Sequence, residues 1–413
     1  MKSELSFQSI FFATFSRYVG GKRFPTNGMV EPILWYFLPR VTSLLMLDTP
    51  HVVSDTIDPI IEVYKNARLQ KKYTLSRFLY WPIYLWCKLP SKSNTRISYK
   101  LRDFFAVLYV AIARRERYDL FIGLESINAL AGLILKKLGI VKTVVYYVSD
   151  YAPVRFPNKI FNAVYLWLDR ICVTYADFTW DVSPAMQKAR ITAGLSDKAT
   201  YRVIHVPNGL FAAQIAPLPI KKRAPHHMVY MGILESDMGP DLPIRALPYV
   251  HRTYPDAFLH IIGGPEKDMI PLEALVKRMH LDAHVRFYGF VKGNKEMADI
   301  VRHCAIGLAP YRAFKDSLRW YGDAGKIRQY TASGLPVVTT NVPPLGHYIV
   351  SKGAGIMTTD TAKSFSDGIL MLLSDKALYK KLSQKAIEVS KDNTWEKVYS
   401  KALADMKRIQ ESL

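Results

Sequence analysis

The stretch from Ala309 to Thr339, APYRAFKDSLRWYGDAGKIRQYTASGLPVVT, decides the fold. It predicts an apolar strand that ends at Ala309, a helix that opens near Asp323, and a turn into a second buried strand. The free N–H groups at such a helix start can bind a diphosphate. Lys326 and Gln329 share one face of this helix, where an ammonium can neutralise phosphate and an amide can bind a hydroxyl. The alternative is a plain amphipathic helix with a surface lysine.

The same alternation of strands and helices extends outward from this stretch in both directions. In the C-terminal half, strands are predicted at residues 227–231, 257–262, 285–288, 306–309, 336–339 and 355–357. In the N-terminal half, they are predicted at residues 9–15, 119–123, 143–148, 178–182 and 201–206. Strands that alternate with helices form parallel sheets covered on both faces, so the predicted fold class is α/β.

The length of 413 residues and the 49% hydrophobic content predict two domains, because single cores seldom grow beyond about 250 residues. An aperiodic stretch rich in proline, PNGLFAAQIAPLPIKKRAP, indicates a linker between them. The predicted organisation is a Rossmann-like N-terminal domain at residues 1–208, a linker at 209–226, a Rossmann-like C-terminal domain at 227–392 and a C-terminal helix at 393–413.

The formal net charge of +21 predicts an anionic partner: nucleic acid, anionic lipid or a phosphorylated small molecule. Residues 61–120 hold thirteen Lys or Arg against four Asp or Glu, interleaved with aromatic residues that include Trp81 and Trp86. The apolar runs 78–87 and 104–113 are each about half the length of a spanning helix. We expect this region to lie in the headgroup layer of an anionic membrane. The alternative is that its aromatic residues belong to the domain core.

The first loop, Gly20-Gly21-Lys22-Arg23, can bring a phosphate close to glycine backbone and two cations. It lacks the G-x-G-x-x-G pattern, so a dinucleotide cofactor is not expected. The three cysteines form no CxxC pair and predict neither a disulfide framework nor a zinc site. A reducing compartment fits this cysteine usage.

The string D-x-x-K-x-x-Q-Y…G-L-P-V-V at residues 323–338 resembles the donor-binding signature of GT-B glycosyltransferases. The large retaining GT-B group carries acids where this chain has Tyr321 and Gln329. The chain is more similar to the membrane-associated β-glucuronosyltransferases of xanthan biosynthesis. It shares with them Gly289, Lys292, Gly307, Ala309, Pro310, Tyr311, Lys326, Gln329, Tyr330, Gly334, Leu335, Pro336 and Val338. The motifs DLFIGLES, VYYVSD and VSPAM extend the resemblance over residues 118–340.

This resemblance implies a GT-B fold, with two Rossmann-like domains facing a central cleft and a C-terminal helix that returns to the N-terminal domain. It implies that the C-terminal domain binds a nucleotide sugar, a UDP-sugar, without a metal or other cofactor. The donor-binding residues that it implies are Gly232, Ile233, Tyr311, Asp323, Lys326 and Gln329. Phe290 replaces the family's acid after Tyr288-Gly289, so the donor sugar stays open, with glucuronic acid as one candidate.

Asp150 is the predicted catalytic base. It follows the predicted strand 143–148, at the carboxyl edge where ligands of doubly wound folds bind. A carboxylate there can take the proton from an attacking acceptor hydroxyl, and the matching aspartate has this role in the family that the chain resembles. Glu125 ends the neighbouring strand and can hold an acceptor hydroxyl or orient Asp150. Arg155 can pair with Asp150 or bind an acceptor pyrophosphate, and simple capping roles are the alternatives for both acids.

Together these features predict an inverting glycosyltransferase that moves a sugar from a UDP-sugar to a lipid-linked glycan in exopolysaccharide synthesis. We expect a peripheral protein on the cytoplasmic face of the plasma membrane. The alternatives are a retaining GT-B transferase, a nucleic-acid-binding protein and a non-catalytic GT-B scaffold. None of the common nucleic-acid-binding motifs is present, so nucleic acid is not an expected partner.

Overall fold

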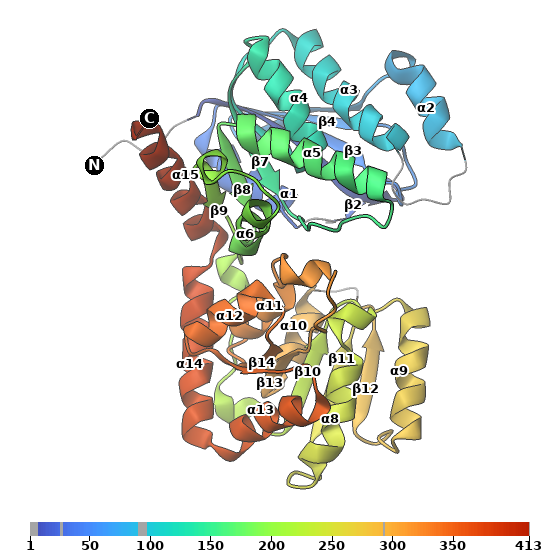
Figure 1. Ribbon diagram of the computed structural model, residues 1–413, viewed down its shortest axis with the longest axis vertical. Coiled ribbons are helices and arrows are strands. Elements are labelled where there is room, and N and C mark those ends of the chain that lie inside the picture. The colour runs from blue at the N-terminus through green and yellow to red at the C-terminus, as the bar shows by residue number, and fades with distance from the viewer. Residues whose placement is uncertain (1–6, 25–27, 90–96, 292–293, 413) are drawn as a thin grey trace. The chain divides into compact units, whose positions relative to one another are not determined.

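The computed structural model describes residues 7–24, 28–89, 97–291 and 294–412. The chain divides into two compact units. Unit 1 comprises Met1–Pro207 and Tyr399–Leu413, and unit 2 comprises Asn208–Val398. Each unit is built on a single sheet with helices packed against it (Figure 1).

The sheet of unit 1 has the strand order β5-β4-β3-β1-β6-β7-β8-β9, with β2 paired to β1. Its parallel strands are β1 (Ser9–Val19), β3 (Ser43–Pro50), β6 (Tyr118–Leu124), β7 (Val141–Val148), β8 (Phe178–Asp181) and β9 (Val203–His205). Its antiparallel strands are β2 (Lys22–Phe24), β4 (Ile60–Lys65) and β5 (Arg68–Thr74). The parallel part places the carboxyl ends of β6 and β7 side by side, which positions the candidate acids.

Four helices of unit 1 lie side by side over one face of this sheet (Figure 1). They are α2 (Trp81–Lys88), α3 (Ile97–Arg114), α4 (Glu125–Lys137) and α5 (Lys159–Tyr175). The other helices that precede unit 2 are α1 (Val30–Phe37), α6 (Pro184–Thr192) and α7 (Asp197–Thr200). Within the described part of the chain, no helix is both long enough and apolar enough to span a bilayer.

The end of the chain returns to unit 1, as predicted. The last helix, α15 (Trp395–Glu411), contributes Tyr399, whose ring centroid lies 5.2 Å from that of Tyr36 and 6.0 Å from that of Trp180. The Ser400 hydroxyl lies 3.0 Å from the Tyr36 hydroxyl. Aromatic pairs at these separations add to the burial energy of the rings, so they hold the terminal helix on unit 1.

Strands β3, β4 and β5 were not predicted. The strand β5 reads RLQKKYT and is almost wholly exposed, so it lacks the apolar run by which the other strands were found. Its cations lie at the edge of the sheet, where they discourage pairing with another chain. The basic region 61–120 is therefore partly a β-hairpin, and only its second half consists of the helices α2 and α3.

Unit 2 has a wholly parallel sheet of order β12-β11-β10-β13-β14-β15. Its strands are β10 (His227–Met231), β11 (Phe258–Ile262), β12 (Val285–Gly289), β13 (Ile306–Ala309), β14 (Val337–Thr340) and β15 (Gly355–Thr358). Its helices are α8 (Asp241–His251), α9 (Glu266–Arg278), α10 (Asn294–His303), α11 (Gly325–Ala332), α12 (Pro344–Ser351), α13 (Ala362–Ser374) and α14 (Lys376–Asp392). All six strands lie where the apolar runs predicted them.

The stretch 209–226, predicted as a linker, packs onto unit 2. The buried Arg223 guanidinium donates to the carbonyl oxygens of Gly334 and Leu218 and to the Ser383 hydroxyl, at 2.8, 2.8 and 3.2 Å. Such charge-assisted hydrogen bonds are about twice as strong as neutral ones. They fix the entry of the chain into unit 2.

Candidate functional site

A buried lysine lies where the sequence predicted a phosphate site in unit 2. Lys326 is 6% exposed, and its ammonium nitrogen has no hydrogen-bond partner among the described residues. The nitrogen lies 4.0 Å from the ring centroid of Tyr230 and 4.9 Å from that of Tyr311. Burial without a hydrogen-bond partner is unfavourable for an ammonium, and a bound anion would offset this cost.

Contacts between α11 and β13 hold Lys326 in this position. A Cβ at Gly307 would lie only 2.3 Å from the Tyr330 ring, so glycine lets the helix approach the strand closely. The Tyr330 hydroxyl accepts from the Met231 N–H at 2.8 Å and donates to the Leu308 carbonyl at 3.1 Å. These bonds tie α11 to two neighbouring strand ends.

Two glycines at strand ends let the backbone pack closely beside the lysine. Gly232 follows β10 with φ 137°, and a Cβ there would lie 3.3 Å from the Lys326 nitrogen. Gly263 follows β11 with φ 153°, and a Cβ there would lie 1.8 Å from the Gly232 carbonyl oxygen. Side chains are excluded at both positions, and the N–H groups of Gly232 and Gly263 donate to the carbonyls of Ile262 and Gly289 at 2.9 and 3.0 Å.

A second cation, Arg319, acts electrostatically on Lys326, and no sequence motif predicted it. The Arg319 guanidinium is held by Asp237 at 3.0 Å and Glu235 at 3.1 Å, both in the segment that follows Gly232. Tyr230 was likewise not predicted, although it lies only two residues before Gly232 in the same strand. Arg319 and Tyr230 belong to segments that approach Lys326 only when unit 2 is folded.

The remaining predicted donor residues have different surroundings. Ile233 is exposed, and its carbonyl accepts from the Tyr230 hydroxyl at 2.5 Å. Gln329 is half-buried, one turn further along α11. Asp323 precedes the helix, which begins at Gly325, and its carboxylate accepts from the Asn208 N–H at 2.7 Å and pairs with Arg328 at 2.8 Å. These contacts within unit 2 fix the start of α11, and the predicted ligand contact of Asp323 stays a prediction.

The surroundings of Lys326 predict that donor affinity depends on pH. Burial, followed by the nearby Arg319 charge, holds the pKa of Lys326 well below the ordinary value of lysine, while Asp237 opposes this shift. A diphosphate would raise this pKa again, so binding takes up a proton between the lowered pKa and about 10.4. In that window we expect affinity for a UDP-sugar to fall up to about tenfold per pH unit as pH rises.

Calorimetry in buffers of different ionisation enthalpy measures this proton uptake directly. The Lys326→Arg variant is the control, because its guanidinium stays charged at all these pH values. An affinity of the unaltered protein that is constant with pH would contradict the prediction.

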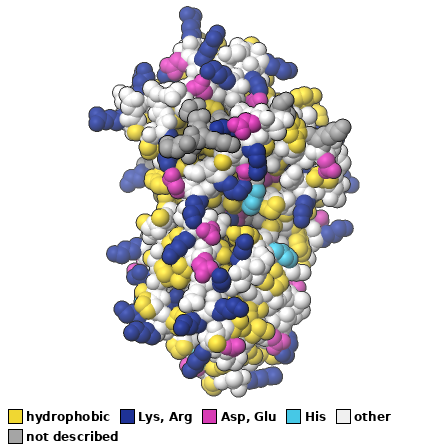
Figure 2. Space-filling view, turned by 90° about the vertical axis from the view of Figure 1, so that its left-hand side faces the viewer, with side chains coloured by type: hydrophobic (Ala, Val, Ile, Leu, Met, Phe, Trp, Pro, Cys, Tyr) yellow, Lys and Arg dark blue, Asp and Glu magenta, His cyan; other side chains and the backbone are white. Residues whose placement is uncertain are grey.

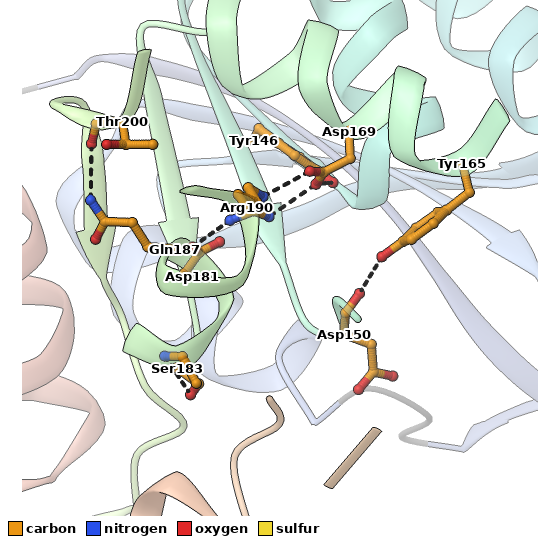
Figure 3. Close-up of polar contacts among 10 residues, drawn as sticks. Tyr146, Asp150, Tyr165, Asp169, Asp181, Ser183, Gln187, Arg190 and Thr200 are labelled. Carbon is orange, nitrogen blue, oxygen red and sulfur yellow. Dashed lines mark hydrogen bonds and ion pairs between the residues drawn. The ribbon is translucent and has the colours of Figure 1, made fainter. Parts of the chain in front are cut away.

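The predicted base lies at the carboxyl end of β7 in unit 1. The Asp150 side chain is 53% exposed, and one of its oxygens lies 3.4 Å from the Arg155 guanidinium. The Tyr165 hydroxyl of α5 donates to the Asp150 backbone carbonyl at 3.3 Å, as Figure 3 shows. The backbone is thus held while the carboxylate stays accessible, which a proton acceptor requires.

Glu125 lies beside Asp150, as the sequence predicted. It begins α4 with φ 67°, a left-handed conformation that costs a non-glycine residue about 1–3 kcal/mol and is concentrated at functional sites. Its carboxyl is hydrogen-bonded by the Ser149 hydroxyl. Burial, together with the charge of Asp150, raises the pKa of Glu125 although Ser149 opposes the shift. Glu125 therefore keeps its proton to higher pH than an ordinary glutamate.

A buried ion-pair network supports the elements behind Asp150 (Figure 3). Arg190 of α6 pairs with Asp169 of α5 at 2.7 Å and with Asp181 of β8 at 2.6 Å. The Tyr146 hydroxyl of β7 donates to Asp169 at 2.9 Å. The network joins two helices to two strands, and the Asp150 carboxylate points away from it.

Two residues of the glycine loop of unit 1, which spans residues 20–23, bind carboxylates of the same unit. Gly20 and Gly21 turn β1 into β2 with φ 57° and 71°, and the Gly20 N–H donates to the Asp55 carboxylate. Arg23 pairs with Asp48 at 3.2 Å and with Glu62 at 2.7 Å, and its predicted phosphate role stays a prediction. Lys22, like Gly20 and Gly21, is exposed.

The predicted membrane residues Trp81 and Trp86 of α2 are both exposed. Their neighbours Tyr80, Tyr84 and Tyr99 are buried, so the alternative interpretation holds for those three rings. Among the described residues, no group of three or more His, Cys, Asp or Glu is placed to hold a metal ion.

Comparisons with known proteins find a family model that matches part of unit 2 and solved structures that share the fold. Residues 225–375 match the family model described as "Glycosyl transferases group 1". Over 188 residues the chain is 27% identical to the glycogen synthase of Mycobacterium tuberculosis, and this match covers 43% of each protein. The chain thus aligns with less than half the length of that relative.

Solved structures resemble almost the whole chain. HepE of Anabaena, in complex with UDP, has a TM-score of 0.66 at 16% identity and covers 98% of this chain and 100% of its own. Sucrose-phosphate synthase from Thermosynechococcus elongatus has a TM-score of 0.68 at 14% identity, with 98% and 99% covered. The predicted two-domain GT-B fold is confirmed. The narrower resemblance to β-glucuronosyltransferases stays a prediction.

Proposed function

We propose that this chain, whose residues 225–375 form a group 1 glycosyl transferase domain, transfers a sugar from a UDP-sugar to a lipid-linked glycan. The observation that carries the proposal is the orphan ammonium of Lys326 beside the glycine strand ends of unit 2. A sugar nucleotide brings two phosphate charges on a narrow backbone, which matches a buried cation next to positions that exclude side chains.

UDP is the nucleotide that the comparisons favour. HepE of Anabaena has been solved with UDP and with UDP-glucose, and its fold extends over the whole of this chain. Glucuronic acid is the first sugar to test, because the sequence resembles transferases of that sugar.

Asp150 would supply general-base catalysis in this reaction. Its carboxylate takes the proton of an acceptor hydroxyl while the hydroxyl oxygen forms a bond to the anomeric carbon. The bond from that carbon to the phosphate oxygen breaks, and UDP leaves with the electron pair, so the configuration inverts. The anomeric configuration of the product, read by NMR, distinguishes this course from a retaining one.

The acceptor and its location complete the proposal. A lipid-linked glycan at the cytoplasmic face of the plasma membrane suits a chain of net charge +21 that exposes Trp81 and Trp86. Cations are spread widely over the molecule, as the face in Figure 2 shows. Net charge alone therefore does not locate the membrane-facing surface.

A thermal-shift panel of nucleotide sugars tests the donor assignment. A ligand that binds only the folded state stabilises it, by about 2.7 kcal/mol at roughly 100 times Kd. We expect the largest shift from UDP-sugars and smaller shifts from GDP-, ADP- and dTDP-sugars. Largest shifts from another nucleotide would reject UDP, and shifts only from DNA or RNA would favour the nucleic-acid-binding alternative.

A further inference from the structure

The outward face of α5 is apolar where a surface helix is normally polar. Ile160, Val164 and Trp167 recur at helical spacing and are 75%, 47% and 60% exposed. One polar residue of the helix faces the protein interior: Asp169 is buried and pairs with Arg190. This reversed pattern leaves a stripe of large side chains that stay exposed among the described residues of unit 1.

The neighbouring helices carry the same kind of stripe. On α3, Phe105, Tyr109 and Ile112 are exposed at positions one turn apart, and on α2 the exposed residues include Trp81 and Trp86. The helices α2, α3, α4 and α5 follow one another across the same face of the sheet (Figure 1). We call the exposed side of α2, α3 and α5 the helix-layer surface. Large exposed apolar surfaces on a soluble fold mark an interaction site.

The charges on these four helices indicate which kind of partner would bind the helix-layer surface. The exposed ions along them are cations: Lys88, Lys100, Lys137, Lys159 and Arg170. The three acids that the four helices contain are not exposed, since Asp103 and Asp169 are buried and Glu125 is half-buried at the sheet edge. Aromatic and aliphatic side chains among cations suit the headgroup layer of an anionic bilayer.

We propose that the helix-layer surface, including α5, lies on an anionic lipid bilayer and inserts Ile160 and Trp167 into it. A second copy of the chain fits this surface less well, because a two-fold contact would bring like charges together. The inference deepens the proposed function and rests on it for the acceptor. The Tyr165 hydroxyl of α5 holds the Asp150 carbonyl, so the helix that meets lipid also supports the predicted base.

This surface differs from the one that the sequence indicated. The basic region 61–120 includes the hairpin of β4 and β5, which forms the edge of the sheet and lies outside the helix layer. The helix α5 lies outside that region and contributes the most exposed stripe. The two assignments therefore predict different effects for changes in α5.

Sedimentation with lipid vesicles tests the proposal without any substrate. The probes are vesicles of phosphatidylcholine with and without phosphatidylglycerol. We expect the unaltered chain to bind the anionic vesicles and the double variant Ile160→Ser/Trp167→Ser to bind them about tenfold more weakly. Added salt is expected to weaken the binding of both proteins, because the cations contribute.

The matched control replaces two exposed apolar residues of unit 2, Ile270→Ser and Met371→Ser, whose side chains are 61% and 50% exposed, and should bind like the unaltered chain. Circular dichroism and the UDP-dependent thermal shift verify that each variant is folded. Equal vesicle binding by the α5 variant would overturn the proposal, and so would a dimer that this variant dissociates. A chain that binds vesicles but no UDP-sugar would reject the proposed function and leave this inference standing.

Discussion

The Asp150→Asn variant is expected to lose sugar transfer by roughly 10³-fold while it binds the donor unchanged. The amide keeps the size and the hydrogen-bonding reach of the carboxylate but cannot accept a proton. The side chain is half exposed and its only described ion pair is the 3.4 Å contact with Arg155, so the fold should tolerate the change. Transfer is measured as release of UDP and as labelled lipid product at saturating donor.

The matched control is Asp177→Asn, also in unit 1. Asp177 pairs with Lys136 and accepts from the Val144 N–H, at the amino end of β8 and so at the opposite edge of the sheet from Asp150. We expect this variant to retain transfer. Full activity of Asp150→Asn would remove Asp150 from the role of base and direct attention to Glu125, whose Glu125→Gln variant should then be the inactive one.

Most strands of the parallel sheets could be predicted because they are buried apolar runs between helices, although β3, which is also parallel and buried, was missed. All six strands of unit 2 were found in this way, and so were β1, β6, β7, β8 and β9 of unit 1. The strand β5 was missed because nearly all its residues face solvent and five of its seven are polar or charged. Edge strands lack the apolar signal by which buried strands are recognised.

The candidate site could be predicted where one short motif carries it. Lys326 and Gly232 were both named from their motifs, and the structure places them in contact distance. The ion pairs of Arg23 could not be predicted, because its partners, Asp48 and Glu62, lie on strands far away in the sequence. Ion pairing between distant segments is a property of the fold, and single-sequence patterns do not contain it.

The Lys326→Met variant is expected to bind UDP-sugars about 100-fold more weakly and to be at least as stable as the unaltered chain. The loss follows from removing a charge-assisted contact to phosphate, worth about 1.5–3 kcal/mol. The retained stability follows from the site itself. The ammonium is buried without a hydrogen-bond partner among the described residues, and methionine fills a similar volume without that desolvation cost.

Opposite signs for binding and stability separate a ligand-binding lysine from a structural one. A lysine that served the fold would lower the melting temperature when replaced, because its partners would be left unpaired.

The control is Lys352→Met, a lysine of unit 2 that also lies near a tyrosine ring, 5.7 Å from the centroid of Tyr348, but is exposed. Calorimetric titration and thermal melts of the two variants give both readouts. If Lys326→Met melts lower and still binds donor, the lysine supports the sheet and the donor site must lie elsewhere. Weaker donor binding without loss of stability is the result expected of a lysine whose charge serves to bind a diphosphate and not to stabilise the fold.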